Sequence, residues 1–129
     1  MDICEAVYKY LKTDTAVCSK IKDRIYPLTL PQKCKLPAVV YNRVSVKRTP
    51  AMQVDSDFCV QNIQFSCYAK SYSDSVDTAN IIRNTLKNYR GQMSDIFVQA
   101  VITVFESENY DLATESYVYI VELQFYFNE

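Results

Sequence analysis

The sequence predicts an α+β domain in which helices pack on one face of a four-stranded, mainly antiparallel sheet. Four segments either alternate apolar and polar residues or are rich in β-branched and aromatic residues, and three others repeat apolar residues at helical spacing. The strand segments come as two pairs separated by one helical segment, which gives the order α-(α)-β-β-α-β-β. With 129 residues and no low-complexity tract, residues 1–129 are expected to form a single domain.

Two short helices are expected at the N-terminus. Apolar residues recur at helical spacing over residues 2–12, which predicts an amphipathic helix. Thr13 or Asp14 can end this helix and cap a second, shorter one. The apolar residues assigned to the buried faces of the two helices are Ile3, Val7, Leu11, Ala16, Val17 and Ile21.

A proline-rich segment separates these helices from the first strand. Pro27, Pro31 and Pro37 each fix their own φ angle and bias the preceding residue away from the helical region. The chain is therefore expected to stay extended until residues 38–46, where β-branched and aromatic residues predict a strand. Nothing in this segment is typical of catalysis.

The second strand is predicted over residues 59–70, where polar and apolar residues alternate. This alternation places Ile63, Phe65, Cys67 and Ala69 on one buried face. The five cysteines of the chain are odd in number and lack a C-x-x-C spacing, so we expect buried or half-buried thiols rather than disulfides or a zinc site.

The third helix is expected to begin with Ser73 as its N-cap, since two aspartates follow it near the positive end of the helix dipole. Apolar residues then recur at helical spacing from Val76 to Tyr89. Gly91 stands where a left-handed C-cap favours glycine.

The last two strands are predicted over residues 96–106 and 116–127. Loops are expected at residues 47–58 and 107–115, with Lys47 and Arg48 at a solvated hairpin tip. The residues assigned to one face of each strand are Ile96, Val98, Ala100, Ile102 and Val104, and Tyr117, Tyr119, Val121, Leu123, Phe125 and Phe127.

The composition excludes several classes of enzyme. The chain has no histidine, so catalytic triads and histidine-ligated metals are excluded. Its single glycine excludes a P-loop and a dinucleotide fingerprint. A carboxylate enzyme remains open. The absence of a signal peptide pattern and of a long apolar run predicts a protein made and kept in a cytoplasm, without a membrane anchor.

Charge and aromatic content point toward association with proteins. The net charge is −1, with 14 Lys and Arg against 15 Asp and Glu, so strong phosphate binding is not expected and self-association is permitted. Tyr68 and Tyr126 fall on outward strand faces, where they could form a protein interface or, alternatively, stack on bases. Glu106, Glu108 and Asp111 could hold a divalent metal, although a solvated acidic loop is the simpler interpretation.

The order of segments resembles that of tail completion, or tail terminator, proteins of tailed bacteriophages and prophages. The resemblance extends over nearly the whole chain. Its motifs are Asp14–Val17, Asp23–Pro27, Leu36–Tyr41, Ile63–Tyr72, Ile82–Leu86, Tyr89–Gly91, Glu106–Asp111 and a last strand that ends at Phe125–Phe127.

This resemblance implies a structural virion protein without catalytic residues or cofactors. Such proteins form a homo-oligomeric ring, commonly a hexamer, on the head-proximal end of the tail tube, where the ring ends tube polymerisation. The implied partners are the major tail tube protein and the head-completion or connector proteins, with DNA only passing through the lumen. The implied location is the bacterial cytoplasm during assembly and the tail or neck of the mature particle.

The residues we assign to a subunit or partner interface are aromatic or charged and lie near expected strand ends and loops. Two other functions stay open: another neck or minor tail component of the same fold, and a small ligand-binding or carboxylate-enzyme domain, which would need a pocket with convergent polar groups. The interface candidates are Arg24, Tyr26, Lys47, Arg48, Tyr68, Tyr110, Asp111 and Tyr126.

Overall fold

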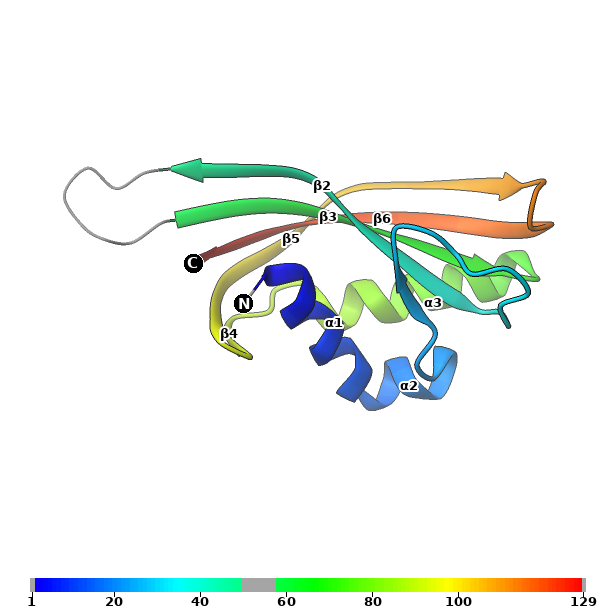
Figure 1. The fold of residues 1–129 in the computed structure, drawn as a ribbon, viewed down its shortest axis with the longest axis horizontal. Helices are drawn as coiled ribbons and strands as arrows, with labels where there is room; N and C mark the ends of the chain where they lie inside the picture. Colours follow the sequence, from blue (N-terminus) through cyan, green and yellow to red (C-terminus); the bar gives the residue numbers. More distant parts are fainter. Residues whose placement is uncertain (1, 50–57, 129) are drawn as a thin grey trace.

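The computed structural model describes residues 2–49 and 58–128, which form a mixed sheet covered by helices on one face (Figure 1). Its strands lie in the order β1-β2-β3-β6-β5-β4. The helices are α1 (Ile3–Thr13), α2 (Thr15–Ile21) and α3 (Tyr72–Leu86). The strands are β1 (Ile25–Pro27), β2 (Ala38–Thr49), β3 (Phe58–Ala69), β4 (Gly91–Met93), β5 (Ile96–Asp111) and β6 (Ser116–Asn128).

The prediction of a four-stranded sheet is wrong, because the sheet has six strands and one parallel pair. β1 runs parallel to β2, and β4 runs antiparallel to β5. Each of these additional strands has only three residues, which is too short for an alternating pattern to be recognised. β1 and β4 also change the element order to α-α-β-β-β-α-β-β-β.

The core lies between the sheet and the three helices. The alternation predicted for β3 is confirmed, since Ile63, Phe65, Cys67 and Ala69 are all fully buried. β6 contributes Val121, Leu123, Phe125 and Phe127 to the same layer, whereas Tyr117 is exposed. The helices cover this layer with buried residues that include Ile3, Val7, Leu11, Val17, Ile21, Ile82 and Leu86.

The ends of the helices follow local hydrogen bonds. Of the two predicted caps of α2, Thr13 and Asp14, the structure has Asp14. Its Oδ2 accepts a hydrogen bond from the Val17 amide at 3.1 Å. The N-cap of α3 is Ser71 rather than Ser73, and its Oγ accepts from the Asp74 amide at 3.2 Å. Gly91 is not the C-cap of α3, since it begins β4.

Gly91 does have a positive φ, 146°, but the first left-handed residue after α3 is Asn88, where φ is 60°. Asparagine tolerates this conformation better than most residues other than glycine. The helix has already ended at Leu86, and the Asn88 amide donates to the Val101 carbonyl of β5 at 2.9 Å. The end of α3 is therefore set by this contact with the sheet.

The predicted face of β5 is wrong beyond Val98, because two β-bulges interrupt the alternation. The register shifts between Val98 and Ala100 and again between Thr103 and Phe105. Each bulge inserts one residue and so moves the following side chains to the other face. Val101 is consequently buried, while Ile102 and Val104 are both 42% exposed.

Both long strands continue into the predicted loops. β2 extends to Thr49, so Lys47 and Arg48 lie in a strand, paired with Val60 and Cys59, and not at a hairpin tip. β5 extends to Asp111, which leaves only residues 112–115 as the turn to β6. Most of the predicted loop 47–58, residues 50–57, lies outside the described residues.

Candidate assembly surfaces

The cavity beside the proline-rich segment does not have the composition of an active site. Its volume is about 330 Å³, and it lies between the proline-rich segment at Leu30–Leu36 and the β5–β6 turn at Ala113 and Thr114. Lys33 and Lys70 are among its lining residues, but no carboxylate is. A general acid–base pair of carboxylates therefore has no place there.

The three acidic residues considered as a metal site are held apart by different partners. The register places Glu106 and Glu108 on the helix-covered face of β5 and Asp111 on the other face. Glu106 Oε1 forms an ion pair with Arg83 Nη1 at 2.6 Å, and Glu108 accepts a hydrogen bond from the Tyr72 hydroxyl at 2.7 Å. Within residues 2–49 and 58–128, no cluster of potential ligands of this kind forms.

The outer edges of the sheet are the most distinctive surfaces of the molecule. β1 pairs only with Val39–Tyr41 of β2, so among the described strands none covers the outer edge of β2 at residues 43–49. β4 pairs only with Ile96–Val98 of β5, which leaves the outer edge at residues 102–111 similarly open within the described structure. An exposed strand edge presents unpaired backbone groups and promotes association.

The two open edges lie on opposite sides and toward opposite ends of the sheet. Figure 1 shows the C-terminal ends of β2 and β5 at opposite ends of the molecule. The β2 edge extends toward the end of the sheet where Phe58 and Asn128 lie, and the β5 edge extends toward the 112–115 turn. The open edges are therefore placed diagonally across the sheet.

The two edges also differ in charge. Residues 43–49 contain three basic residues, Arg43, Lys47 and Arg48, and no acidic one. Residues 102–111 contain three acidic residues and no basic one. Arg43 forms an ion pair with Asp2, and Glu106 forms one with Arg83. The difference in charge between the edges therefore rests mainly on Lys47 and Arg48 against Glu108 and Asp111.

Apolar and aromatic side chains are exposed along both edges. Val44 is 46% exposed on β2, and Phe105 is 52% exposed on β5. Near the end of β5, the rings of Tyr110 and Tyr117 pack edge to face with their centroids 5.1 Å apart. The ring of Tyr117 packs in the same way against Tyr72, with the centroids 6.1 Å apart. Aromatic residues of this kind are enriched in protein interfaces.

The candidate residues from the sequence fall into two groups, and the first lies on the open edges. Lys47 is exposed on β2, and Arg48 follows it in the same strand, although its side chain lies outside the described structure. Tyr110 is 45% exposed on β5. Asp111 closes the β5–β6 turn, because its carboxylate accepts hydrogen bonds from the Thr114 hydroxyl and the Ala113 amide.

The second group makes contacts within the chain. Arg24 Nε donates to the Pro37 carbonyl at 2.8 Å, and the Tyr26 hydroxyl accepts from the Cys34 thiol at 3.5 Å, so both hold the proline-rich segment in place. Tyr68 is half-buried on the helix-free face, where burial raises its pKa. Tyr126 lies on the same face and donates to Gln124.

Sequence reasoning missed Glu108, Phe105 and Ile102 as surface candidates. Glu108 was assigned to the loop 107–115, Ile102 to the same strand face as Ile96 and Val98, and Phe105 to the opposite face of that strand without a role. The bulges of β5, which change these faces, cannot be recognised from alternation. The one available signal was charge, since 102–111 is acidic and 43–49 is basic.

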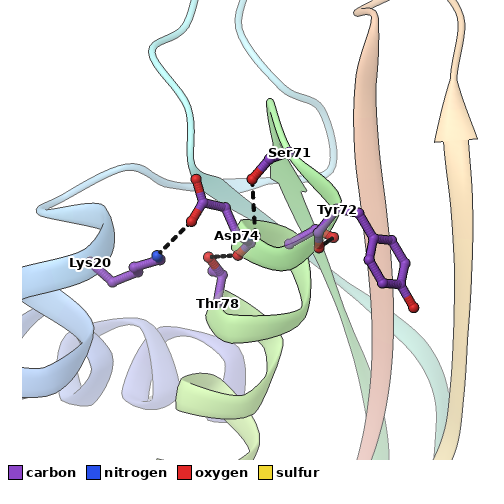
Figure 2. A network of polar contacts seen from close by, with 6 residues as sticks. Lys20, Ser71, Tyr72, Asp74 and Thr78 are labelled. Atoms are coloured by element: carbon purple, nitrogen blue, oxygen red, sulfur yellow. Dashed lines mark hydrogen bonds and ion pairs between the residues drawn. The ribbon is translucent and has the colours of Figure 1, made fainter.

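A polar network fixes α2 against the start of α3 (Figure 2). Lys20 Nζ lies 3.1 Å from Asp74 Oδ1, and the Asp74 amide donates a hydrogen bond to Ser71 Oγ. Thr78 donates to the Asp74 carbonyl one turn later at 2.7 Å. The hydrogen bond and charge of Lys20, and then a side-chain hydrogen bond between the carboxyl and Ser71, lower the pKa of Asp74.

This network predicts a pH-dependent contribution to stability. A carboxyl whose pKa is lower in the folded state stabilises the fold fully above its ordinary pKa, and the contribution is lost as the pH falls through the folded value. We expect Lys20→Met to flatten the loss of stability below about pH 4, measured by urea unfolding between acid and neutral pH. The control Lys35→Met, at an exposed lysine, should retain the wild-type acid dependence; equal curves for Lys20→Met and wild type would contradict the assignment.

Comparison with known proteins gives a likeness of fold. No family model matches the chain, and no curated protein matches it either. Among solved structures, it is similar to a chain of the virion of a native gene transfer agent particle, with a TM-score of 0.76 and 11% identity. The alignment covers 97% of this chain and 93% of the other.

At this level of identity the comparison establishes the fold. The class is thus an α+β domain with the fold of a protein found in a gene transfer agent virion. None of the helices in residues 2–49 and 58–128 combines the length and the apolarity required to cross a bilayer.

Proposed function

We propose that this chain is a structural protein of a phage-like virion that caps the head-proximal end of the tail tube as a ring. The ring ends tube polymerisation and provides the surface that joins the tail to the head-completion proteins. Its fold is shared with a chain of a gene transfer agent virion, and its segment order resembles that of tail terminators. The protein acts by assembly and has no catalytic role.

One observation supports the ring in particular: the two open edges of the sheet differ in position and charge. Contacts between two different patches of each subunit are head-to-tail contacts, and they close into a ring when the rotation between subunits allows it. A single self-complementary patch would instead favour a two-fold dimer. The ring is expected to hold six copies, as is common in the family that the sequence resembles.

The proposed passage of DNA agrees with the charges of the helix-free face. On β2, β3, β6 and β5, from Asn42 onward, the register places side chains of known position on this face. Most of them are amides, hydroxyls and aromatic rings. The described charged side chains that the register places on this face are Lys47 and Asp111, toward opposite ends, and Glu122, which accepts a hydrogen bond from Asn62 at 2.8 Å. A lumen lined by this face would bind phosphates weakly, so DNA could slide through it.

A tube-length assay tests this function. The chain is added to the polymerising major tail tube protein encoded beside it, and tube lengths are measured by electron microscopy. Substoichiometric amounts are expected to stop elongation and to leave a ring at one end of each tube. Binding along the tube wall, or binding to another tail component without an effect on length, would instead assign the chain to a different position in the tail.

A further inference from the structure

We propose that neighbouring copies join through antiparallel β-pairing between residues 43–49 of β2 and residues 102–111 of β5. This inference rests on the proposed ring and names the surfaces that would form it. The partner is a second copy of this chain, and the contact continues the sheet of one subunit into that of the next. Each open edge would thereby receive the hydrogen-bonding partner that it lacks in the described structure.

Strand direction determines that the pairing is antiparallel. β2 pairs antiparallel with β3, β3 with β6, and β6 with β5. β5 therefore runs opposite to β2 within one subunit. When copies are related by rotation about an axis roughly along the strands, the β2 of the next copy keeps its direction and runs antiparallel to the first copy's β5.

The diagonal placement of the edges agrees with a closed assembly. Val46 lies level with Gln61, Phe125 and Val101 across the sheet, whereas the middle of the β5 edge, Glu106, lies five residues further along β5. One of these five residues is the bulge residue Val104, so the step is four strand positions, and matching the edges needs a shift of about 13 Å along the strands for every four strands, which span about 19 Å. The resulting strand tilt of about 35° lies at the lower end of the range of closed barrels.

The side chains of the two edges are complementary in charge and in facing. With Val46 opposite Glu106, both side chains lie on the helix-covered side, and Lys47 and Phe105 both lie on the helix-free side. If one strand slides along the other by two residues, every side chain stays on the same side of the sheet. With Val46 opposite Glu106, Arg43 lies opposite Glu108 on the helix-covered side, because Val44 is the extra residue of the β2 bulge. Exposed Val44 and Phe105 add apolar contact.

Charge reversal with rescue tests the contact. Arg43→Glu and Glu108→Lys should each weaken ring assembly at least about tenfold, because Arg43 and Glu108 face each other in this register and like charges would then oppose each other at every contact. The double variant should recover assembly, since each contact again joins opposite charges. Matched controls are Lys35→Glu and Asp77→Lys, which reverse exposed charges away from both edges and should assemble as the wild type does. Circular dichroism of each variant verifies folding.

Hydrogen exchange adds a measurement that a loss of folding cannot imitate. Native mass spectrometry follows assembly up to about 1 mM, where even weak pairing is populated. In assembled protein, amides of residues 43–49 and 102–111 should exchange more slowly than in the monomer. A strict monomer at this concentration, a ring with unchanged exchange at both edges, or no rescue in the double variant would overturn the inference. Tube capping by such a protein would leave the proposed function standing, whereas failure to cap tubes would refute that function separately.

Discussion

Replacing Phe125 by alanine is expected to lower the free energy of unfolding by about 3–5 kcal/mol. Phe125 is fully buried near the centre of the sheet, where β6 pairs with Gln61 of β3 on one side and Val101 of β5 on the other. Truncation removes the transfer energy of the ring and leaves a cavity between the sheet and the helices. Since domains of this size are stable by only about 5–15 kcal/mol, the variant should be close to unfolding.

Urea unfolding of dilute, monomeric protein, followed by circular dichroism, measures this loss. Phe105→Ala is the matched control, because Phe105 is the same residue type on the neighbouring strand but is 52% exposed. Its cost should stay within about 0.5–1 kcal/mol. Equal losses for the two variants would show that the core does not lie between the helices and this face of the sheet.

The second large expected effect is the protection of two thiols against modification. Cys59 and Cys67 are fully buried, and burial strongly raises the pKa of Cys67, which disfavours its reactive thiolate. Their reaction with a thiol reagent in native buffer should be at least about 10³-fold slower than in denaturant, because it requires the sheet to open. Cys18 and Cys34 are half-buried and should react in the folded protein.

Mass spectrometry of the modified peptides at successive times distinguishes the thiols. Cys4 should react more slowly than Cys18, because burial raises the pKa of its thiol. Rapid modification of Cys67 in native buffer would show that the β3 face is open to solvent. Uniform rates at all five cysteines would contradict the described packing as a whole.

The elements that could be predicted from the sequence are those with a long repeating pattern. β3 and the second half of β6 alternate without interruption, and α1 repeats its apolar residues over three turns, so one buried face was sufficient to recognise each. β1 and β4 escaped recognition because they have three residues each, and their pairing depends on contacts with distant strands. The resulting error was the number of strands in the sheet.

The bulges explain why the candidate surface was only partly predicted. Alternation assigned Ile102 and Val104 to the same face as Ile96 and Val98, whereas the register shifts at Val98/Ala100 and Thr103/Phe105 separate them from that face and leave both exposed. The polar end of β5 resembled a loop because both its faces are exposed there, which leaves no alternating pattern. Lys47 and Tyr110 were nevertheless selected from residue type alone, and both lie on open edges.

Charge separation between two strand edges connects the fold to the proposed assembly. A soluble protein normally protects a long exposed edge with charged residues, a proline or a covering element. Here each edge carries charges of a single sign, and the signs are opposite. Two identical edges from different copies repel each other, whereas the β2 edge of one copy attracts the β5 edge of another. This disfavours two-fold dimers and favours head-to-tail contacts.

The most direct test of the central claim is a cryo-electron microscopy map of tail tubes assembled in the presence of this chain. The account predicts a closed ring at one end of each tube, with β2 of every subunit beside β5 of its neighbour. A map in which the chain is absent from tube ends, or lies along the tube wall as separate monomers, would contradict it.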